Sequence, residues 1–378
     1  MDIKYWIGLS SKEEIEPSFI LSLYEYFGDI ERVFNCSEKD LEGINIEINK
    51  KKFNTFLSLR DKINLDKTRE EVEKRGINVL TFDDERYPKM LKEIHNPPMI
   101  LYYKGDLFSC NLERTVAFVG SRRASTNGKD SVRRIINDFN NTDICIISGL
   151  AEGIDASSHR AALDNNLKTI GVIASGFDFQ YPSSNKDLYE KIPKGCGAIV
   201  TEYYPTVEPL RFHFPQRNRI VTGLSFGTVV GEAALKSGAL ISANLTLEQG
   251  RELMCIPGSI NNKNTEGIYK LLKNGATMVT SGEDVLNALN WEIVPSPIDR
   301  LCNGVTPTVV PSPEGRGNSS TIPLEYSTIL NIIEVEPCGF DKLQTETGLN
   351  TEELLKTLTI MEVEGFIESI EGDRYKRA

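Results

Sequence analysis

The sequence predicts an α/β protein whose core is a parallel β-sheet with helices on both faces. Across the middle of the chain, short apolar runs alternate with stretches of helical periodicity. Strands that are buried on both faces read as continuous apolar runs, and their alternation with helices is typical of βαβ units. The length of 378 residues exceeds one ordinary core and suggests two or three domains. We therefore expect a Rossmann-like core, a small N-terminal helical domain and a C-terminal winged-helix-like domain.

The composition excludes several classes of protein. With 40% hydrophobic and 26% charged residues, the chain is typical of soluble globular proteins. No apolar run approaches the roughly 18 residues of a membrane span, and the first residues lack the layout of a signal peptide. The seven cysteines form no CxxC pair, so we expect neither a disulfide framework nor a structural metal. We expect a cytoplasmic protein without a cofactor.

The net charge of −11 is unevenly distributed along the chain. From Trp291 to Ala378 there are 15 acidic and 7 basic residues, a net charge of −8, so the preceding 290 residues carry only −3. The body of the chain is therefore almost neutral and leaves room for a local basic pocket. The overall acidity does not exclude nucleic acid as a partner.

Residues 1–75 read as a small domain of short amphipathic helices. Apolar residues recur there at helical spacing in two stripes. The first stripe is Ile20, Leu21, Leu23, Tyr24 and Phe27, and the second is Phe53, Phe56, Leu57 and Leu59. Between the stripes, Leu41-Glu42-Gly43-Ile44 resembles the turn of a helix-hairpin-helix, whose amides can hold a phosphate. The alternative is an ordinary turn in a helical bundle.

Residues 76–290 are expected to form an extended Rossmann-like domain, with its regular α/β part from about residue 110. The stretch from Asn78 to Gly105 reads as irregular, and prolines precede an apolar run at Ile100–Tyr103 that we expect to be an edge strand. The later strand runs are Thr115–Val119, Ile144–Ile147, Thr169–Ala174, Ala198–Val200, Thr228–Val230, Leu253–Ile256 and Thr277–Val279. Helical stretches separate them, which predicts a parallel sheet.

Two further segments complete the chain. Residues 291–323 are rich in proline and glycine and read as a linker. Residues 324–378 read as three helices and a hairpin of Phe366–Ile370 with Arg374–Lys376, which is the winged-helix order. The third helix carries Glu352, Glu353, Glu362 and Glu364 against Lys356. Because acidic side chains repel phosphate, we interpret this domain as an interaction or scaffold module instead of a sequence reader.

The turns that follow the strands are candidate ligand sites, because a doubly wound sheet binds its ligand at the carboxyl ends of its strands. In the first turn, Gly120 lets an anion approach the backbone, Ser121 offers a hydroxyl, and Arg122 offers a planar fork for phosphate. The turn is not a GxGxxG. The second strand is followed by Ser148-Gly149 instead of an acidic residue for a ribose, so NAD is disfavoured.

The second turn, Ser148–Asp155, opens backbone amides at the start of a helix. His159 lies four residues after Asp155, a spacing that permits contact on one helical face. We interpret Asp155 and His159 as a cap and a packing group more readily than as catalysts. With three histidines in the chain, no GxSxG and no Walker pattern, the sequence favours binding over turnover.

A third cluster, Leu210–Ile220, interleaves basic and aromatic side chains. It contains Arg211, Phe214, Arg217 and Arg219 together with Asn218. Guanidinium groups suit phosphates and aromatic rings suit bases, so the pattern favours single-stranded nucleic acid. The alternative is a helix start whose aromatic residues are core and whose arginines form salt bridges.

At these residues the sequence resembles the family of DNA-processing protein A (DprA, also called Smf), known from natural transformation. The motifs are Val119–Arg122, Ser148–His159, Phe214–Ile220, Glu232-Ala233, Ser237–Ile241, Glu248–Glu252 and Ile256–Gly258. Glu85–Pro88 and Pro97-Pro98 also resemble the segment that leads into the Rossmann-like domain in this family. Several long motifs in the same order make the resemblance specific. It is weaker at the two ends, where the family often has a small helical domain and a winged helix.

The resemblance implies a protein that is not an enzyme and that acts in natural transformation. It would bind and protect incoming single-stranded DNA, displace or tolerate single-strand-binding protein, and load the RecA recombinase. It also implies a homodimer through the Rossmann-like domain. The implied DNA-binding residues are Gly120, Ser121, Arg122, Arg211, Phe214, Arg217, Asn218 and Arg219, with phosphate contacts from Ser148 and Gly149. Arg211 stands where relatives use lysine, so the charge is kept and its geometry is altered.

The rival hypothesis is a Rossmann-like enzyme such as a nucleoside 5′-monophosphate phosphoribohydrolase. Such enzymes use glycines, an arginine and a glutamate, and Glu232 after Val229-Val230-Gly231 is the candidate here. Their PGGxGT-type loop is absent, because Val230-Gly231-Glu232-Ala233 has one glycine where they have several. Release of adenine from AMP would distinguish this enzyme from a DNA-binding protein.

Overall fold

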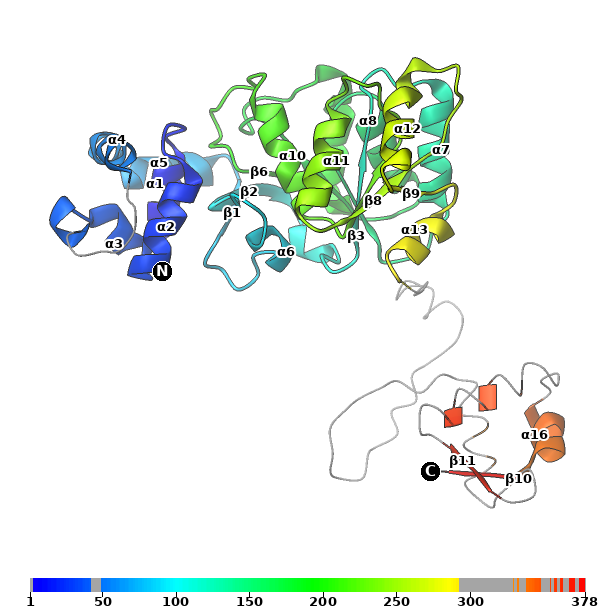
Figure 1. Ribbon diagram of the computed structural model, residues 1–378. Coiled ribbons are helices and arrows are strands. Elements are labelled where there is room, and N and C mark those ends of the chain that lie inside the picture. The colour runs from blue at the N-terminus through cyan, green and yellow to red at the C-terminus, as the bar shows by residue number, and fades with distance from the viewer. Residues whose placement is uncertain are drawn as a thin grey trace. The chain divides into compact units, whose positions relative to one another are not determined.

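The protein divides into two compact units, Met1–Thr306 and Pro307–Ala378, which we describe separately. The computed structural model describes residues 3–41 and 49–291 (Figure 1). In the second unit it describes residues 329, 332, 338–347, 354, 357, 358, 361, 362, 367–370 and 374–377. The expected linker at 291–323 and the expected turn at 41–44 lie, apart from Trp291 and Leu41, outside the described residues. No helix in the described ranges is both long and apolar enough to cross a membrane.

The first unit is built on a nine-stranded sheet, with strand order β1-β2-β6-β5-β4-β3-β7-β8-β9. The strands are β1 (Asn78–Thr81), β2 (Ile100–Gly105), β3 (Thr115–Val119), β4 (Cys145–Ser148), β5 (Thr169–Val172), β6 (Gly197–Thr201), β7 (Gly227–Val230), β8 (Glu252–Cys255) and β9 (Thr277–Met278). All pairs from β6 through β9 are parallel. The order reverses between β3 and β7, as in doubly wound folds. The predicted Rossmann-like parallel sheet is confirmed.

The expectation of an edge strand at Ile100–Tyr103 is wrong. The run forms β2, which pairs with β6 on one side and with β1 on the other, both antiparallel. The edge is β1, which lies in the stretch expected to be irregular. Its four residues pair in register with β2, from Asn78 opposite Tyr103 to Thr81 opposite Ile100. A strand of this length leaves little periodicity in the sequence, which is why it was not predicted.

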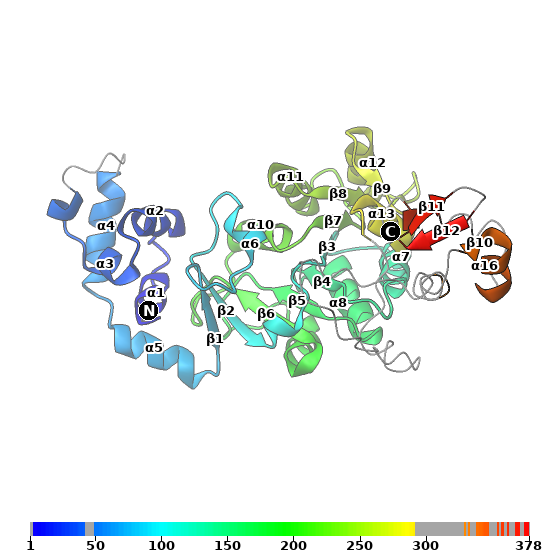
Figure 2. The same ribbon diagram turned by 90° about the horizontal axis from the view of Figure 1, so that it is seen from below.

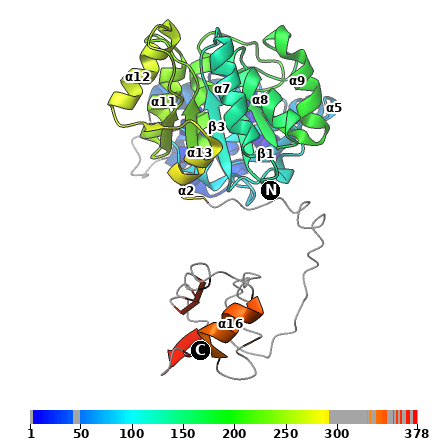
Figure 3. The same cartoon turned by 90° about the vertical axis from the view of Figure 1, so that its right-hand side faces the viewer.

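Helices cover both faces of the parallel sheet (Figure 3). They are α6 (Lys89–Lys92), α7 (Thr126–Asn137), α8 (Ile154–Asp164), α9 (Lys186–Lys191), α10 (His213–Gly223), α11 (Ala239–Glu248), α12 (Glu266–Lys273) and α13 (Gly282–Ala288). Side chains of α6, α10, α11 and α12 share one hydrophobic cluster, and side chains of α7, α8 and α13 share another. Alternate residues of a strand supply the two clusters, since successive side chains point to opposite faces. In β4, Ile147 enters the first cluster and Ile146 the second.

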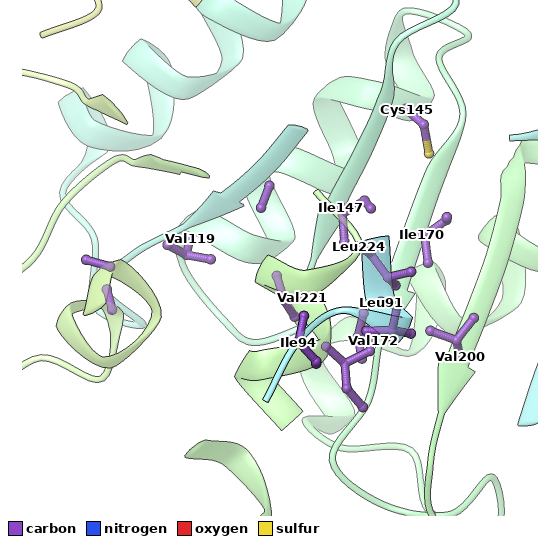
Figure 4. Packing of buried hydrophobic residues seen from close by; sticks show 14 of the residues in the cluster. Leu91, Ile94, Val119, Cys145, Ile147, Ile170, Val172, Val200, Val221 and Leu224 are labelled. Carbon is purple, nitrogen blue, oxygen red and sulfur yellow. The ribbon is translucent and has the colours of Figure 1, made fainter. Parts of the chain in front are cut away.

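The first cluster packs α10 against the middle of the sheet. Val221 and Leu224 lie against Ile147, Ile170 and neighbouring strand residues (Figure 4). The packing fixes the direction of α10, whose first turn therefore emerges at the carboxyl ends of the strands. This placement brings the cluster of arginines and aromatic residues to the edge where the strand-end turns lie.

The N-terminal helices adjoin the β1–β2 end of the sheet (Figure 2). They are α1 (Lys4–Ser10), α2 (Pro17–Phe27), α3 (Ile30–Asn35), α4 (Lys50–Arg60) and α5 (Leu65–Lys74). One hydrophobic cluster contains both Trp6 of these helices and Tyr102 of β2. Arg75 also donates two hydrogen bonds of 2.9 Å to the carboxylate of Asp178. The helices agree with the sequence expectation, and a domain boundary at residue 75 stays a prediction.

The second unit contains a three-stranded sheet of order β10-β12-β11. Its elements are β10 (Cys338–Gly339), α16 (Phe340–Thr347), β11 (Ile367–Ile370) and β12 (Arg374–Arg377). The described positions 354, 357, 358, 361 and 362 are helical, and Leu354, Leu358 and Met361 are buried in one cluster. The antiparallel β11–β12 pair is the predicted hairpin.

Candidate functional site

A pocket of about 630 Å³ opens at the carboxyl ends of the central strands. Its walls come from the turns after β3 and β4, from the first turns of α10 and α11, and from Tyr181. It contains seven of the ten predicted site residues: Gly120, Arg122, Gly149, Arg211, Phe214, Arg217 and Asn218. The residues singled out in the sequence are thus brought together at one edge of the sheet.

Hydrogen bonds to neighbouring segments fix the backbone of the turn after β3. The Ser121 amide donates to the main-chain carbonyl of Glu232 at 2.7 Å, and the Ile154 amide donates to the Ser121 carbonyl at 3.3 Å. A Cβ at Gly120 would lie 2.4 Å from the Ile154 side chain, so only glycine lets the turn approach α8 this closely. Because the backbone is fixed, the exposed side chain of Arg122 starts from a defined position at the pocket mouth.

The Glu232 side chain links two other segments of the chain near this turn. Its carboxylate accepts hydrogen bonds from the Ser125 amide at 2.9 Å, from the Ser125 hydroxyl at 2.5 Å and from Asn262 Nδ2 at 3.0 Å. A Cβ at Gly128 would lie 2.5 Å from the Glu232 carboxyl carbon. Glu232 is almost fully buried and does not line the pocket. Its contacts are those of a structural clamp.

The turn after β4 is organised around Asp155. Its carboxylate accepts from the amides of Gly149 at 3.1 Å and Ala151 at 3.4 Å, so Asp155 caps this turn as the sequence suggested. Ser148 is fully buried, and its hydroxyl donates to the Phe118 carbonyl at 2.6 Å. The Ser148 side chain therefore faces the sheet and not the pocket.

Arg217 is a buried cation beneath the pocket floor, only 3% exposed. Its Nη1 donates to the Gly149 carbonyl at 2.6 Å and to the Val172 carbonyl. Burial lowers the pKa of Arg217, and the nearby Asp155 carboxylate opposes that shift. Burial likewise raises the pKa of Asp155, while Arg217 and the two amides oppose the rise. The two groups stabilise each other's charge and bind the β4 turn to α10.

The accessible cations and rings of the pocket come from the start of α10, the segment before it, the turn after β3 and the connection after β5. Arg211 is exposed at the pocket mouth. The Arg122 guanidinium carbon lies 4.8 Å from the centre of the Phe214 ring, and the Tyr181 ring meets Phe214 at a centroid distance of 5.6 Å. Asn218 lies one turn further along α10. Two cations, two aromatic rings and an amide therefore converge on one opening.

Three predicted residues do not line the pocket. The Ser121 hydroxyl accepts from the Arg123 amide at 3.2 Å, and Ser148 faces the sheet. Arg219 Nη2 donates to Glu202 at 2.5 Å, with both side chains about nine-tenths buried. Conversely, Tyr181 and the start of α11 at Ser237–Ser242 line the pocket without having been predicted. The available sequence signal was the Ser237-Gly238 pair, two small residues directly before α11 in the connection that follows β7.

His159 is fully buried in α8. Its Nδ1 lies 2.7 Å from the Thr169 hydroxyl. Burial and the neighbouring arginines lower the pKa of His159 to about 3. The imidazole is therefore neutral at physiological pH and acts as a packing group. Among the residues described by the structure, no cluster of histidine, cysteine or carboxylate side chains is arranged to hold a metal.

A cavity of similar size, about 620 Å³, lies between the N-terminal helices and α10. Glu13, Glu14, Glu16 and Glu202 line it, and Glu13 lies 3.1 Å from Nε2 of the buried His213. The carboxylates make this cavity unsuitable for phosphate. Of these two cavities, the pocket at the strand ends is the one whose charges suit an anion.

Comparisons with known proteins assign this architecture to a family. The model of the family DNA recombination-mediator protein A matches residues 78–290, which include every strand from β1 to β9. The DprA winged helix domain model matches residues 318–373, as expected for the C-terminal segment.

Individual relatives agree with the family models. The chain is 45% identical over 203 residues to DNA processing protein DprA of Streptococcus pneumoniae, covering 54% of this chain and 71% of the relative. It is 30% identical over 395 residues to protein Smf of Synechocystis, covering 99% of this chain and 98% of the relative.

Two solved structures are similar to the described fold. The X-ray structure of DNA processing protein A from Streptococcus pneumoniae has a TM-score of 0.63 and 36% identity, covering 77% of this chain and 97% of that one. A structure of the Helicobacter pylori protein, reported for its single-stranded DNA binding mode, has a TM-score of 0.51 and 28% identity, covering 57% and 97%. The chain belongs to the DNA recombination-mediator protein A family, also called DprA or Smf.

Proposed function

We propose that this protein binds single-stranded DNA in the pocket at the carboxyl ends of its central strands. The observation that carries the proposal is the Arg122 guanidinium lying over the Phe214 ring, with Arg211 at the same mouth. A guanidinium fork suits one phosphate, and an aromatic ring suits one base. The single-stranded DNA binding mode reported for the Helicobacter pylori relative supports the same ligand class for this chain.

The pocket favours one strand over two. A cavity of about 630 Å³ has room for a few nucleotide groups, and we expect a duplex to be too wide for it. Most of the convergent groups are cations, rings and small residues, which contact phosphates and base faces, and Asn218 is the amide among them. Binding should therefore depend little on sequence.

We extend the proposal to a role in natural transformation. In this role the protein protects incoming DNA in the cytoplasm, tolerates or displaces single-strand-binding protein, and loads RecA as a homodimer. Membership of the family supports this role. Pull-down of RecA by the full chain, with and without bound single strands, tests it.

We also propose that the protein is not an enzyme. The rival phosphoribohydrolase needs a glutamate that is free to act on a nucleotide. Glu232 instead holds Ser125 and Asn262 by hydrogen bonds of 2.5–3.0 Å and lies outside the pocket. Incubation with AMP should release no adenine, and release that is lost in Glu232→Gln would favour the enzyme.

A salt-titrated binding assay tests the proposed function. A fluorescent single strand and its duplex are titrated with the full chain at several salt concentrations. We expect tighter single-strand binding at every concentration, and an affinity that falls linearly on a log–log plot as counterions are released. Equal affinity for the duplex at physiological salt would contradict the proposal.

A further inference from the structure

A second cavity, of about 370 Å³, lies beside the pocket along the groove between α7 and α8. The two helices pack against each other, and Figure 3 shows them side by side. Lys129 and Arg133, one helical turn apart on α7, form one wall, and Arg160 of α8 contributes to the other. We call this cavity the α7–α8 groove.

The α7–α8 groove is continuous with the pocket. Arg122 lines both cavities. The turn after β4 borders the pocket through Ala151 and the groove through Glu152. The segment after β5 does the same through Tyr181 and Ser184. A chain that leaves the pocket across Arg122 therefore enters the groove directly.

The cations of the groove differ in how far they are already neutralised. Arg160 Nη2 donates to Asp187 at 2.9 Å, so its charge is satisfied within the protein. Arg133 meets Asp130 at 3.4 Å in a solvent-exposed pair, which contributes little. Within the described ranges, no hydrogen bond or ion pair engages the ammonium of Lys129. Among the three cations that α7 and α8 contribute, Lys129 is thus the one most available to an anion.

One acidic side chain, that of Glu152, lines the groove beside these cations. Glu152 accepts a hydrogen bond of 2.8 Å from the Ser184 hydroxyl. Gly153 lines the groove beside Glu152 and has a φ of +80°. A Cβ at this position would lie 2.1 Å from the Ser121 carbonyl oxygen, so the position requires glycine. An anion can approach the floor without meeting a side chain at this position.

We propose that the α7–α8 groove is a second phosphate site, in which Lys129 and Arg133 hold the backbone of the strand that leaves the pocket. Arg122 stands at the junction of the two sites. The inference rests on the proposed function, since it extends the path of the same single strand. The proposal predicts that the protein contacts more nucleotides of the strand than the pocket alone can hold.

The test is the affinity for oligothymidylates of increasing length, from about 4 to about 16 nucleotides, the range of known single-strand site sizes. Wild-type affinity should rise with length. Lys129→Glu should reduce affinity for the longest oligonucleotide by about five- to tenfold and leave the shortest one that binds within about twofold. Lys129→Ala should flatten the salt slope by about 0.7 on the long oligonucleotide only.

Lys62→Glu is the matched control, because Lys62 is exposed beyond α4 and undergoes the same change of charge. It should bind both lengths like the wild type. Equal losses in Lys129→Glu and Lys62→Glu, or an equal loss at every length in Lys129→Glu, would overturn the second site and leave the pocket intact. Failure of the wild type to bind any single strand would overturn the proposed function itself.

Discussion

The guanidinium of Arg122 lies over the ring of Phe214, with 4.8 Å between the guanidinium carbon and the ring centre. The two residues are 92 positions apart: Arg122 follows β3 and Phe214 lies in the first turn of α10. A cation over an aromatic face is held in place by the ring quadrupole. Arg122 is therefore oriented toward the pocket by Phe214 before any ligand arrives, which reduces the entropy lost on binding.

This contact predicts that Arg122 and Phe214 are energetically coupled. Each alanine substitution should weaken single-strand binding by about 1–3 kcal/mol, because one removes a charge-assisted bond and the other a stacking face. The double variant should fall short of the sum by about 0.5–1 kcal/mol. Equilibrium titrations of the four proteins measure the coupling. Additive losses would show that the two side chains act independently.

Arg211 should behave as a separate phosphate anchor. It is exposed, so Arg211→Ala should leave the melting temperature unchanged while flattening the salt slope by about 0.7. Arg211→Lys keeps the charge and should restore the slope, with part of the affinity lost because the fork is missing. Titrations at several salt concentrations give the slopes. A lower melting temperature in Arg211→Ala, with the slope retained, would contradict this role.

Arg217 should be needed for the fold more than for the ligand. Arg217→Ala leaves the Gly149 and Val172 carbonyls and the Asp155 charge without their buried partner. Unfolding free energy should fall by about 3–5 kcal/mol, which corresponds to a melting temperature lower by on the order of 10 °C. Thermal melts of Arg217→Ala and Arg211→Ala, measured under the same conditions, compare the two melting temperatures. Equal melting temperatures of the two variants would mean that Arg217 is not structural.

His159 should make stability depend on pH. Its folded-state pKa of about 3 lies below the unfolded value of 6.5, so only the unfolded chain takes up this proton between those values. Stability is therefore complete above pH 6.5 and is lost as pH falls toward 3, by roughly 1.4 kcal/mol per pH unit. Denaturant melts of wild type and His159→Gln isolate this contribution. Parallel pH profiles of the two proteins would contradict it.

The sequence was sufficient for the parallel sheet, because strands such as Thr115–Val119 are uniformly apolar and buried on both faces. It was insufficient for β1, whose four residues, Asn78–Thr81, depend on pairing with β2. Such pairing is set by tertiary contacts that leave little local pattern.

The sequence indicated which turns lie at the pocket, but it did not indicate which of their side chains reach it. Arg217 and Arg219 belong to the same basic cluster as Arg211, but the rotation of α10 carries them toward buried carbonyls and Glu202. Tyr181 reaches the pocket from a connection with no basic pattern. Burial and direction of a side chain follow from packing, which spacing alone does not reveal.

The most direct test of the account is the single-strand affinity of Arg122→Ala, measured together with its melting temperature. Arg122 is exposed and its guanidinium rests on a ring at the pocket mouth. We predict an affinity lower by about 1–3 kcal/mol, a salt slope flatter by about 0.7, and a melting temperature close to that of the wild type. A substantially lower melting temperature, with affinity and salt slope intact, would contradict the assignment of this pocket to DNA.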